Sequence, residues 1–338
     1  MQSGRGTMNV ESALSSARML SGHWLDHLAS LASGRRRVFK GGWGDERLIE
    51  RLATVARFEQ APPAIDMRWE RPRLEGAVAV TDGWFDAPVA ELPEPARRAL
   101  VRRLAPSAPC SRPRPAYVVL ASSGDEGFAL RDRLWRPLVA RGDLEAFFIE
   151  NAMYGARRPA GQKGADIRTV SDHLLMNVSM VEEARALLEH LAREGHVRLG
   201  IAGYSMGGSM AALVAAVTPR PLAAAIFAAG ASGVPVFTEG LLSRGIDHDA
   251  LGRGARARIG RVFGVADLDR HPPPRRPEAA VLVAGRSDAY VFAAQVSALH
   301  ARWMGSELRW VDTGHAGALL LRGDVLRRAA RDAMDRLG

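Results

Sequence analysis

The chain has 338 residues, of which 47% are hydrophobic and 25% are charged, and it contains one cysteine, Cys110. This length and apolar content suffice for one large or two small domains, and a single cysteine excludes an internal disulfide framework and a Cys-rich metal site. Lys and Arg number 46 against 37 Asp and Glu, a net charge of +9, which makes nucleic acid or an anionic membrane surface the first partners to consider. Nearly all of the basic residues are arginines. The enrichment of Arg together with Ala and Gly indicates a compositional bias that needs no anionic partner.

The first 60 residues are predicted to form a helical N-terminal extension. Apolar residues recur at helical spacing over residues 10–31, and a second helical pattern covers residues 46–58. The basic run at residues 35–37 between them is typical of a solvated helix end. No secretory signal pattern opens the chain, and no apolar run is long enough to cross a bilayer, so we expect a cytoplasmic protein.

Residues 61–338 are predicted to form an α/β domain with a mostly parallel, eight-stranded sheet and helices on both faces. The expected strands are residues 65–69, 77–81, 117–121, 146–149, 197–202, 222–229, 279–284 and 307–311. Helical patterns cover residues 131–141, 170–194, 206–217, 291–303 and 317–337. Residues 230–277, rich in Gly, Arg and Pro, interrupt this alternation and are predicted to be an insertion that forms a cap or active-site loops. Partial disorder is the alternative, because the segment is highly charged.

A G-x-S-x-G motif centred on Ser205 follows an apolar strand and precedes a helical run. The motif alone is a weak signal, but this strand–turn–helix setting is the one that a serine nucleophile on a sharp turn requires. Gly203 and Gly207 remove side chains that would collide where strand and helix approach. Ser205 is therefore the candidate nucleophile, and the N–H of Met206 at the start of the helix is the candidate first oxyanion donor.

A serine nucleophile needs a general base, and the base needs an orienting acid. Asp288 follows the apolar strand at residues 279–284 and His315 follows the last strand, which is the order of acid and base expected in this setting. Each residue has an alternative role at the end of a helix, and Asp312 is a rival for the acid, although it is close in sequence to His315. The other histidines singled out, His173, His190, His248 and His271, are interpreted as ordinary surface or packing residues.

The loop after the strand at residues 117–121 is expected to supply the second oxyanion donor. No His-Gly-Gly-Gly motif is present. The N–H of Ser123 is the first choice and that of Ser122 the second, and a plain glycine-containing turn is the alternative. Asp125 and Glu126 in the same loop have no nearby His or Cys, so we predict neither a metal site nor a cofactor.

Several segments resemble the α/β-hydrolase domain-containing protein 18 family, a branch of the α/β-hydrolase superfamily. They are V-F-K-G-G-W-G (38–44), S-G-D-E-G-F (123–128), E-N-A-M-Y-G-A-R-R-P (150–159), S-M-G-G (205–208), A-S-G-V (231–234) and S-D-A-Y-V (287–291). The resemblance implies an α/β-hydrolase fold with Ser205 as nucleophile, Asp288 as acid and His315 as base. It also implies an acyl-ester or lipid substrate. Ser122 departs from the glycine that relatives often have in the oxyanion loop.

The sequence thus predicts a serine-dependent carboxylic ester hydrolase that acts through an acyl-enzyme on a small-molecule or lipid acyl ester. A thioesterase or acyltransferase with the same triad, and a non-catalytic α/β-hydrolase scaffold, are the alternatives. Packing against the core is the preferred interpretation of the N-terminal helix, and contact with an anionic membrane surface is the alternative that the charge would suit. No helix-turn-helix, zinc-finger or aromatic-stacking pattern supports nucleic acid as a partner.

Overall fold

The computed structural model describes residues 24–32, 37–110 and 112–338. Its centre is one sheet with the strand order β1-β3-β4-β6-β5-β7-β8-β9-β10, and β2 pairs with β3. Six adjacent strands run parallel, in the order β6-β5-β7-β8-β9-β10, whereas β1 to β4 pair antiparallel at one side. The strands are β1 (Arg68–Trp69), β2 (Arg73–Glu75), β3 (Val78–Asp86), β4 (Arg98–Pro106), β5 (Ala116–Leu120), β6 (Glu145–Ile149), β7 (Leu199–Tyr204), β8 (Ala223–Phe227), β9 (Ala280–Gly285) and β10 (Glu307–Val311).

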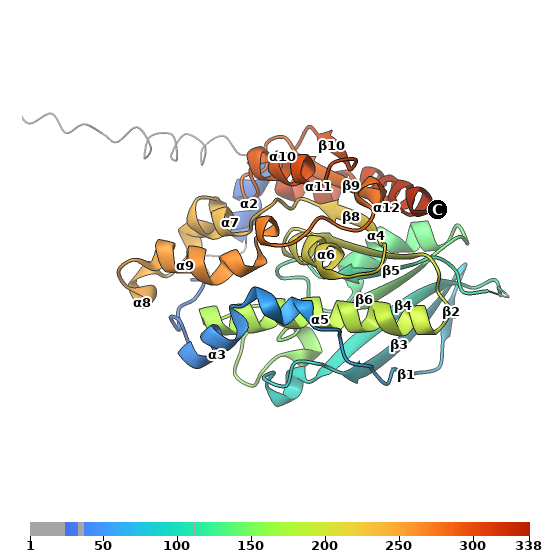
Figure 1. Cartoon of the computed structure of the whole chain (residues 1–338), viewed down its shortest axis with the longest axis horizontal. Helices are drawn as coiled ribbons and strands as arrows, with labels where there is room; N and C mark the ends of the chain where they lie inside the picture. Colours follow the sequence, from blue (N-terminus) through green and yellow to red (C-terminus); the bar gives the residue numbers. More distant parts are fainter. Residues whose placement is uncertain (1–23, 33–36, 111) are drawn as a thin grey trace, which may run out of the picture.

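Helices connect the strands and cover both faces of the sheet (Figure 1). The α-helices are α2 (Trp24–Ala32), α3 (Glu46–Leu52), α4 (Ala129–Val139), α5 (Val170–Arg193), α6 (Met206–Val217), α7 (Val234–Thr238), α8 (His248–Leu251), α9 (Ala255–Phe263), α10 (Ala293–Arg302), α11 (His315–Leu321) and α12 (Gly323–Leu337). The short 3-10 helices are η1 (Val55–Glu59), η2 (Glu94–Ala96), η3 (Gly155–Arg157), η4 (Leu241–Gly245), η5 (Gly264–Ala266), η6 (Leu268–Arg270) and η7 (Pro277–Ala279).

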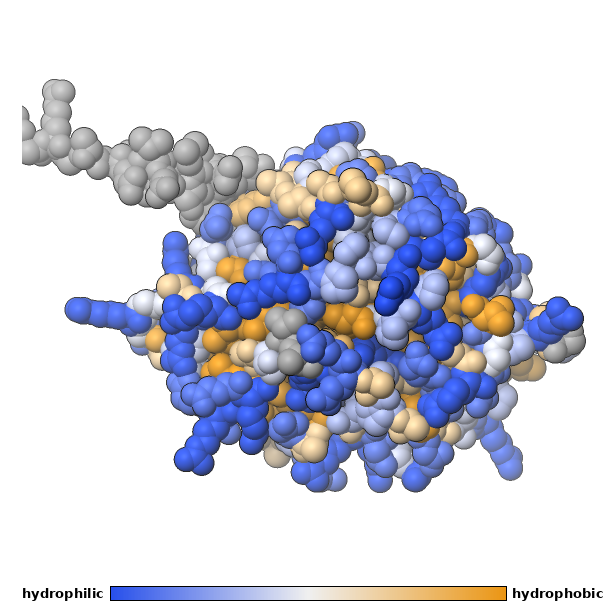
Figure 2. All heavy atoms as spheres, in the orientation of Figure 1, coloured by the Kyte–Doolittle hydropathy of each residue, from blue (hydrophilic) through white to orange (hydrophobic). Residues whose placement is uncertain are grey.

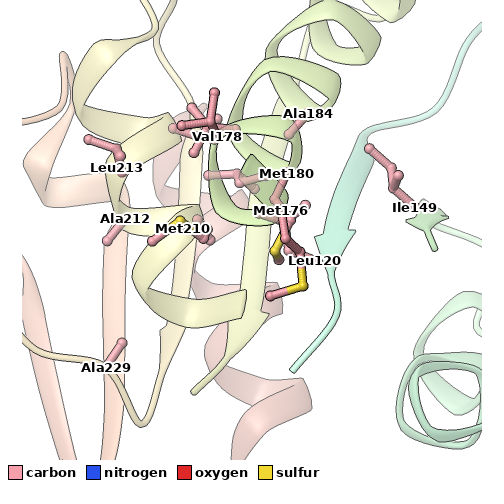
Figure 3. Close-up of a cluster of buried hydrophobic side chains, with 14 of the residues drawn as sticks. Leu120, Ile149, Met176, Val178, Met180, Ala184, Met210, Ala212, Leu213 and Ala229 are labelled. Carbon is pink, nitrogen blue, oxygen red and sulfur yellow. The ribbon is translucent and has the colours of Figure 1, made fainter. Parts of the chain in front are cut away.

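Two hydrophobic layers hold the helices on the sheet. On one face, α5 and α6 bury Met176, Met180, Met210 and Leu213 against strand residues such as Leu120 (Figure 3). On the other face, α4 and α12 pack on the alternate side chains of the same strands. The central strands β5 to β9 are buried along their whole length, which is why they read as continuous apolar runs in the sequence.

The predicted mostly parallel sheet with helices on both faces is confirmed, but the sheet has ten strands and not eight. Strands β2 and β4 are not among the predicted strands. Strand β4 contains three arginines among its nine residues, which hid its alternation of buried and exposed positions. The arginines are accommodated because neighbouring strands supply carboxylates: Arg102 pairs with Asp82 at 2.7 Å, and Arg103 with Glu145 at 2.8 Å.

The N-terminal segment and the segment at residues 230–277 lie against each other. Val38 and Ile246 form a parallel bridge in which Val38 N–H donates to Gly245 O at 2.7 Å. Figure 1 shows α7, α8 and α9 of the later segment together at one end of the molecule, with α2 and α3 beside them. Residues 10–23 of the predicted N-terminal helix lie outside the described residues, and α2 is its described part. The domain limits at residue 60 and at 230–277 remain a prediction.

Hydrophilic side chains cover most of the face shown in Figure 2, with hydrophobic ones in smaller groups between them. Many arginines are engaged in ion pairs, such as Arg309 with both Glu307 and Asp332. Within the described ranges, no helix combines the length and the apolar character needed to span a bilayer.

Candidate active site

Ser205 occupies a sharp turn between β7 and α6. Its backbone has φ 57° and ψ −120°, a conformation that a residue with a side chain seldom adopts. A Cβ on Gly203 would lie 2.2 Å from Gly207 O, and one on Gly207 would lie 2.6 Å from Ala121 O. Both glycines are therefore required by close backbone approach, and together they let the turn present Ser205 beyond the end of the sheet.

The structure brings Asp288 and His315 together although 27 residues separate them. The distance from His315 Nδ1 to Asp288 Oδ2 is 2.6 Å, and the Asp288 side chain is only 1% exposed. The other oxygen of Asp288 accepts hydrogen bonds from the backbone N–H groups of Tyr290 and Val291, both at 2.8 Å. Asp288 thus caps the turn that follows β9 and binds the imidazole at the same time, so its cap role does not conflict with the predicted role of acid.

The turn of Ser205 adjoins His315 through its preceding residue. Tyr204 packs its ring against the imidazole at 5.3 Å between centroids, and its hydroxyl donates a hydrogen bond to His315 O. The ring of Tyr290 lies on the imidazole as well, at 5.0 Å. Ser205, Asp288 and His315 therefore lie at the same edge of the sheet, where the parallel strands end.

The surroundings of His315 raise the pKa of its imidazole. Burial lowers its pKa, but the negative charge and hydrogen bond of Asp288, together with the charge of Asp26, raise it by more. The net pKa of His315 is therefore above the ordinary value of 6.5. This is the behaviour expected of a general base that must accept and hold a proton during a reaction.

The rival acid, Asp312, is at the surface. Its side chain is 86% exposed and pairs with Arg286 at 3.1 Å, whereas Asp288 holds the Nδ1 position of His315. A residue three positions before His315 is too close in sequence to reach the ring from the required side. Asp312 accordingly points to Arg286 and not to the imidazole.

The four other histidines singled out in the sequence, His173, His190, His248 and His271, have separate surroundings. His173 is buried among the rings of Phe39, Phe237 and Phe263, and burial lowers its pKa to about 4. His271 is also buried, with Nε2 2.8 Å from Val265 O, while His248 is exposed and His190 half-buried.

The candidate oxyanion donors come from two segments, the start of α6 and the loop after β5. Met206 begins α6, so its N–H has no carbonyl partner one turn earlier in the helix. The loop after β5 passes over the first turn of α6, as the closeness of Ala121 O to Gly207 shows. Ser123 lies in this loop, exposed, and Tyr154 approaches it with a hydroxyl that also accepts from Gly124 N at 3.4 Å. The assignment of Met206 and Ser123 as donors remains a prediction.

Asp125, which the sequence left without a role, belongs to a buried ion pair. It binds Arg131 at 2.8 Å, and Arg131 also donates to Ile149 O at 2.6 Å and to Gly127 O at 2.5 Å. Burial raises the pKa of Asp125, and the charge of Arg131 opposes that rise. The pair fixes the loop that contains Ser123 to the end of β6. Among the described residues, no group of three or more His, Cys, Asp or Glu could hold a metal ion.

The segment at residues 150–159 forms a second buried network behind this loop. Arg157 is fully buried and binds both carboxylate oxygens of Glu183, at 2.5 and 2.8 Å. Its guanidinium also donates to Ala96 O at 2.7 Å, and Ser179 donates to Glu183 at 2.7 Å. These hydrogen bonds leave no donor of Arg157 free for a ligand. The side chain instead joins α5 to the η2 turn and to Glu150 at the end of β6.

We expect Glu183→Gln to lower the free energy of unfolding by about 3–5 kcal/mol, because it leaves the guanidinium of Arg157 buried without its counter-charge. Asp324→Asn removes the partner of Arg328 in an exposed pair at 2.7 Å and should cost less than about 1 kcal/mol. Urea unfolding of both variants measures the difference, and equal losses would contradict the role assigned to burial.

One residue at this site, Asp26 of α2, is not among the residues predicted from the sequence. It is fully buried and accepts hydrogen bonds from the backbone of His315 and of Ala289. An acidic residue in the first turn of a helix is common, so no local signal sets it apart. The contact only exists because α2 packs on α11.

The comparisons with known proteins agree with this architecture. A family model described as "Alpha/beta hydrolase domain containing 18" matches residues 36–257 and 254–336. Acetyl xylan esterase 1 from Thermoanaerobacterium sp. is similar in structure, with a TM-score of 0.58 and 12% identity over 88% of this chain and 97% of that one. An acetyl xylan esterase from Paenibacillus sp. gives a TM-score of 0.56 with 14% identity over 87% and 96%.

An S-formylglutathione hydrolase from Agrobacterium tumefaciens is also similar, with a TM-score of 0.52 and 15% identity over 80% of this chain and all of that one. At these identities the solved structures establish the α/β-hydrolase fold, which confirms the predicted fold class. The family match covers most of the chain and confirms the resemblance found in its segments. The chain belongs to the alpha/beta hydrolase domain containing 18 family.

Proposed function

We propose that this protein is a serine-dependent carboxylic ester hydrolase with Ser205, Asp288 and His315 as its catalytic triad. The observation that supports this most is the buried Asp288–His315 hydrogen bond of 2.6 Å beside a strained serine turn. Strain of this kind persists where the surrounding structure enforces it, and it clusters at sites of function. Esterases among the structurally similar proteins fit the same chemistry.

In the proposed reaction, Asp288 accepts the Nδ1–H of His315, which leaves Nε2 to take the proton of Ser205 Oγ as that oxygen attacks the ester carbonyl. The N–H groups of Met206 and Ser123 stabilise the resulting oxyanion. His315 then returns the proton to the departing alcohol, and an acyl-enzyme remains on Ser205. Water, deprotonated by His315, attacks the acyl-enzyme, and the acid leaves as Ser205 recovers its proton.

Exposed apolar side chains near α11 favour a lipid acyl ester as substrate. Leu320 and Leu321 at the end of α11 are 63% and 64% exposed, and Leu28 on the adjacent α2 is 51% exposed. Helix α11 begins at His315, so Leu320 and Leu321 lie within two turns of the proposed base. An apolar surface at this place suits contact with lipid at a membrane surface.

A panel of esters of graded acyl length, from acetyl to palmitoyl, tests the proposal together with labelling by a fluorophosphonate. We expect labelling of the wild type and higher kcat/KM for the longer chains. Turnover of short esters alone would refute the lipid substrate, and a folded wild type without labelling or turnover would indicate a non-catalytic scaffold. Including thioesters and an alcohol acceptor in the panel separates hydrolysis of esters from thioesterase and acyltransferase activity.

The raised pKa of His315 sets the pH dependence. The base must be neutral to take a proton from Ser205, so kcat/KM is expected to fall as the pH decreases through the pKa of His315, with a midpoint above 6.5. A pH profile on a short ester, with protein stability checked at each pH, measures this midpoint. A midpoint below 6.5 would contradict the electrostatics described for the site.

A further inference from the structure

Asp26 lies where the two loops of the proposed acid and base meet. Its side chain is fully buried. One carboxylate oxygen accepts from Ala289 N at 3.0 Å and from His315 N at 2.9 Å, and the other accepts from Ala316 N at 2.8 Å. Ala289 directly follows Asp288. The carboxylate of Asp26 therefore connects the backbone next to the proposed acid with the backbone of the proposed base, His315.

The position of Asp26 has a physical reason in the start of α11. The first N–H groups of a helix have no partners within it, and the cap residue here is Gly314, which has no side chain to supply one. A carboxylate from α2 takes that place and is also favoured by the positive end of the helix dipole. Among the ion pairs of the described residues, none involves Asp26, so backbone N–H groups are the contacts that hold it.

His315 is consequently fixed at three atoms. Its N–H donates to Asp26, its carbonyl accepts from the hydroxyl of Tyr204, and its Nδ1 binds Asp288. The backbone carbonyl and the ring are held by groups that belong to the sheet and its loops. The N–H is held by a segment 289 residues earlier in the chain.

We propose that Asp26 is a positioning residue that fixes the separation of the Asp288 and His315 loops and so makes helix α2 part of the catalytic unit. This inference rests on the proposed function. Holding a base and its acid in one geometry is worth a large factor in rate, since a displacement of about 1 Å can cost about 100-fold. The groups that face His315 are the carboxylates of Asp26 and Asp288 and the phenols of Tyr204 and Tyr290.

The test uses Asp26→Asn in the full chain. The amide keeps the size of the side chain but turns one acceptor into a donor that faces backbone N–H groups. We expect kcat on a short ester to fall by about 10- to 100-fold with KM little changed, and the acid limb of the pH profile to move to lower pH because one negative charge beside His315 is lost. Asp26→Glu, which keeps the charge and both acceptors, should recover part of kcat.

Asp45→Asn is the matched control. Asp45 caps α3 in the same N-terminal segment by accepting from Leu48 N at 3.0 Å, away from His315. This variant should lose stability without a change in kcat or in the pH profile. If Asp26→Asn lowers the melting temperature as Asp45→Asn does while kcat and the acid limb stay at wild-type values, Asp26 is only a helix cap and the proposal is wrong.

A readout independent of activity separates this proposal from the proposed function. Titration of the His315 ring by NMR should show a lower pKa in Asp26→Asn than in the wild type, and an unchanged pKa would overturn the proposal. In the wild type, the amide hydrogens of Ala289, His315 and Ala316 should exchange slowly, and fast exchange at all three would also overturn it, even where the variant does not fold. A wild type without ester turnover that still passes both tests would refute the esterase function and leave the positioning contact in place.

Discussion

Ser205→Ala is expected to reduce kcat on esters by about 10⁴- to 10⁶-fold and to abolish fluorophosphonate labelling. The reason is that no other group can form the acyl-enzyme once Oγ is removed, while the binding surface and oxyanion donors remain. Single-turnover kinetics with a chromogenic ester measure the loss. Ser209→Ala is the matched control, because Ser209 lies one turn further along α6 and donates its backbone N–H to Ser205 O at 2.9 Å. It should retain labelling and most of kcat.

A second variant at Ser205 separates chemistry from backbone strain. Ser205→Gly lacks the same oxygen but tolerates φ 57° without a steric penalty. It should be as inactive as the alanine variant, yet its free energy of unfolding should exceed that of Ser205→Ala by about 1 kcal/mol. Retained labelling in both variants would show that the nucleophile is a different residue.

Asp288→Asn should lower kcat by about 10⁴-fold with little change in KM. The amide can donate to Nδ1 of His315 and so favour the tautomer in which Nε2 carries the hydrogen and cannot accept the proton of Ser205. It also removes the hydrogen-bonded charge that raises the pKa of His315, so the remaining activity should have its acid limb at lower pH. Steady-state kinetics over a range of pH measure both effects.

Asp312→Asn tests the rival assignment directly. Asp312 is exposed and paired with Arg286, so its loss should change kcat by less than about twofold, in keeping with the small effect of most surface ion pairs. A large loss in Asp312→Asn together with normal turnover in Asp288→Asn would reverse the assignment of the acid.

The sequence by itself determined the class of fold and the order of its candidate residues. Strands buried on both faces appear as continuous apolar runs. The G-x-S-x-G turn requires glycines because neighbouring backbone atoms leave no space for a Cβ. Ser205, Asp288 and His315 each follow a strand, so their meeting at one edge of the sheet could be expected from a parallel arrangement. The search for apolar runs did not find β4, because this strand contains arginines. The carboxylates that pair with these arginines lie on other strands and cannot be recognised from the local sequence.

Only the tertiary structure decided which acid meets the imidazole and what else holds it. Asp288 and Asp312 are equivalent in type, and their difference lies in burial and in the direction from which each approaches His315. Asp26 is decided in the same way, since its three hydrogen bonds join segments separated by more than 260 residues. Local sequence encodes strands, turns and caps, but a buried carboxylate finds its partners through packing between distant helices, and that information is present only in the folded chain.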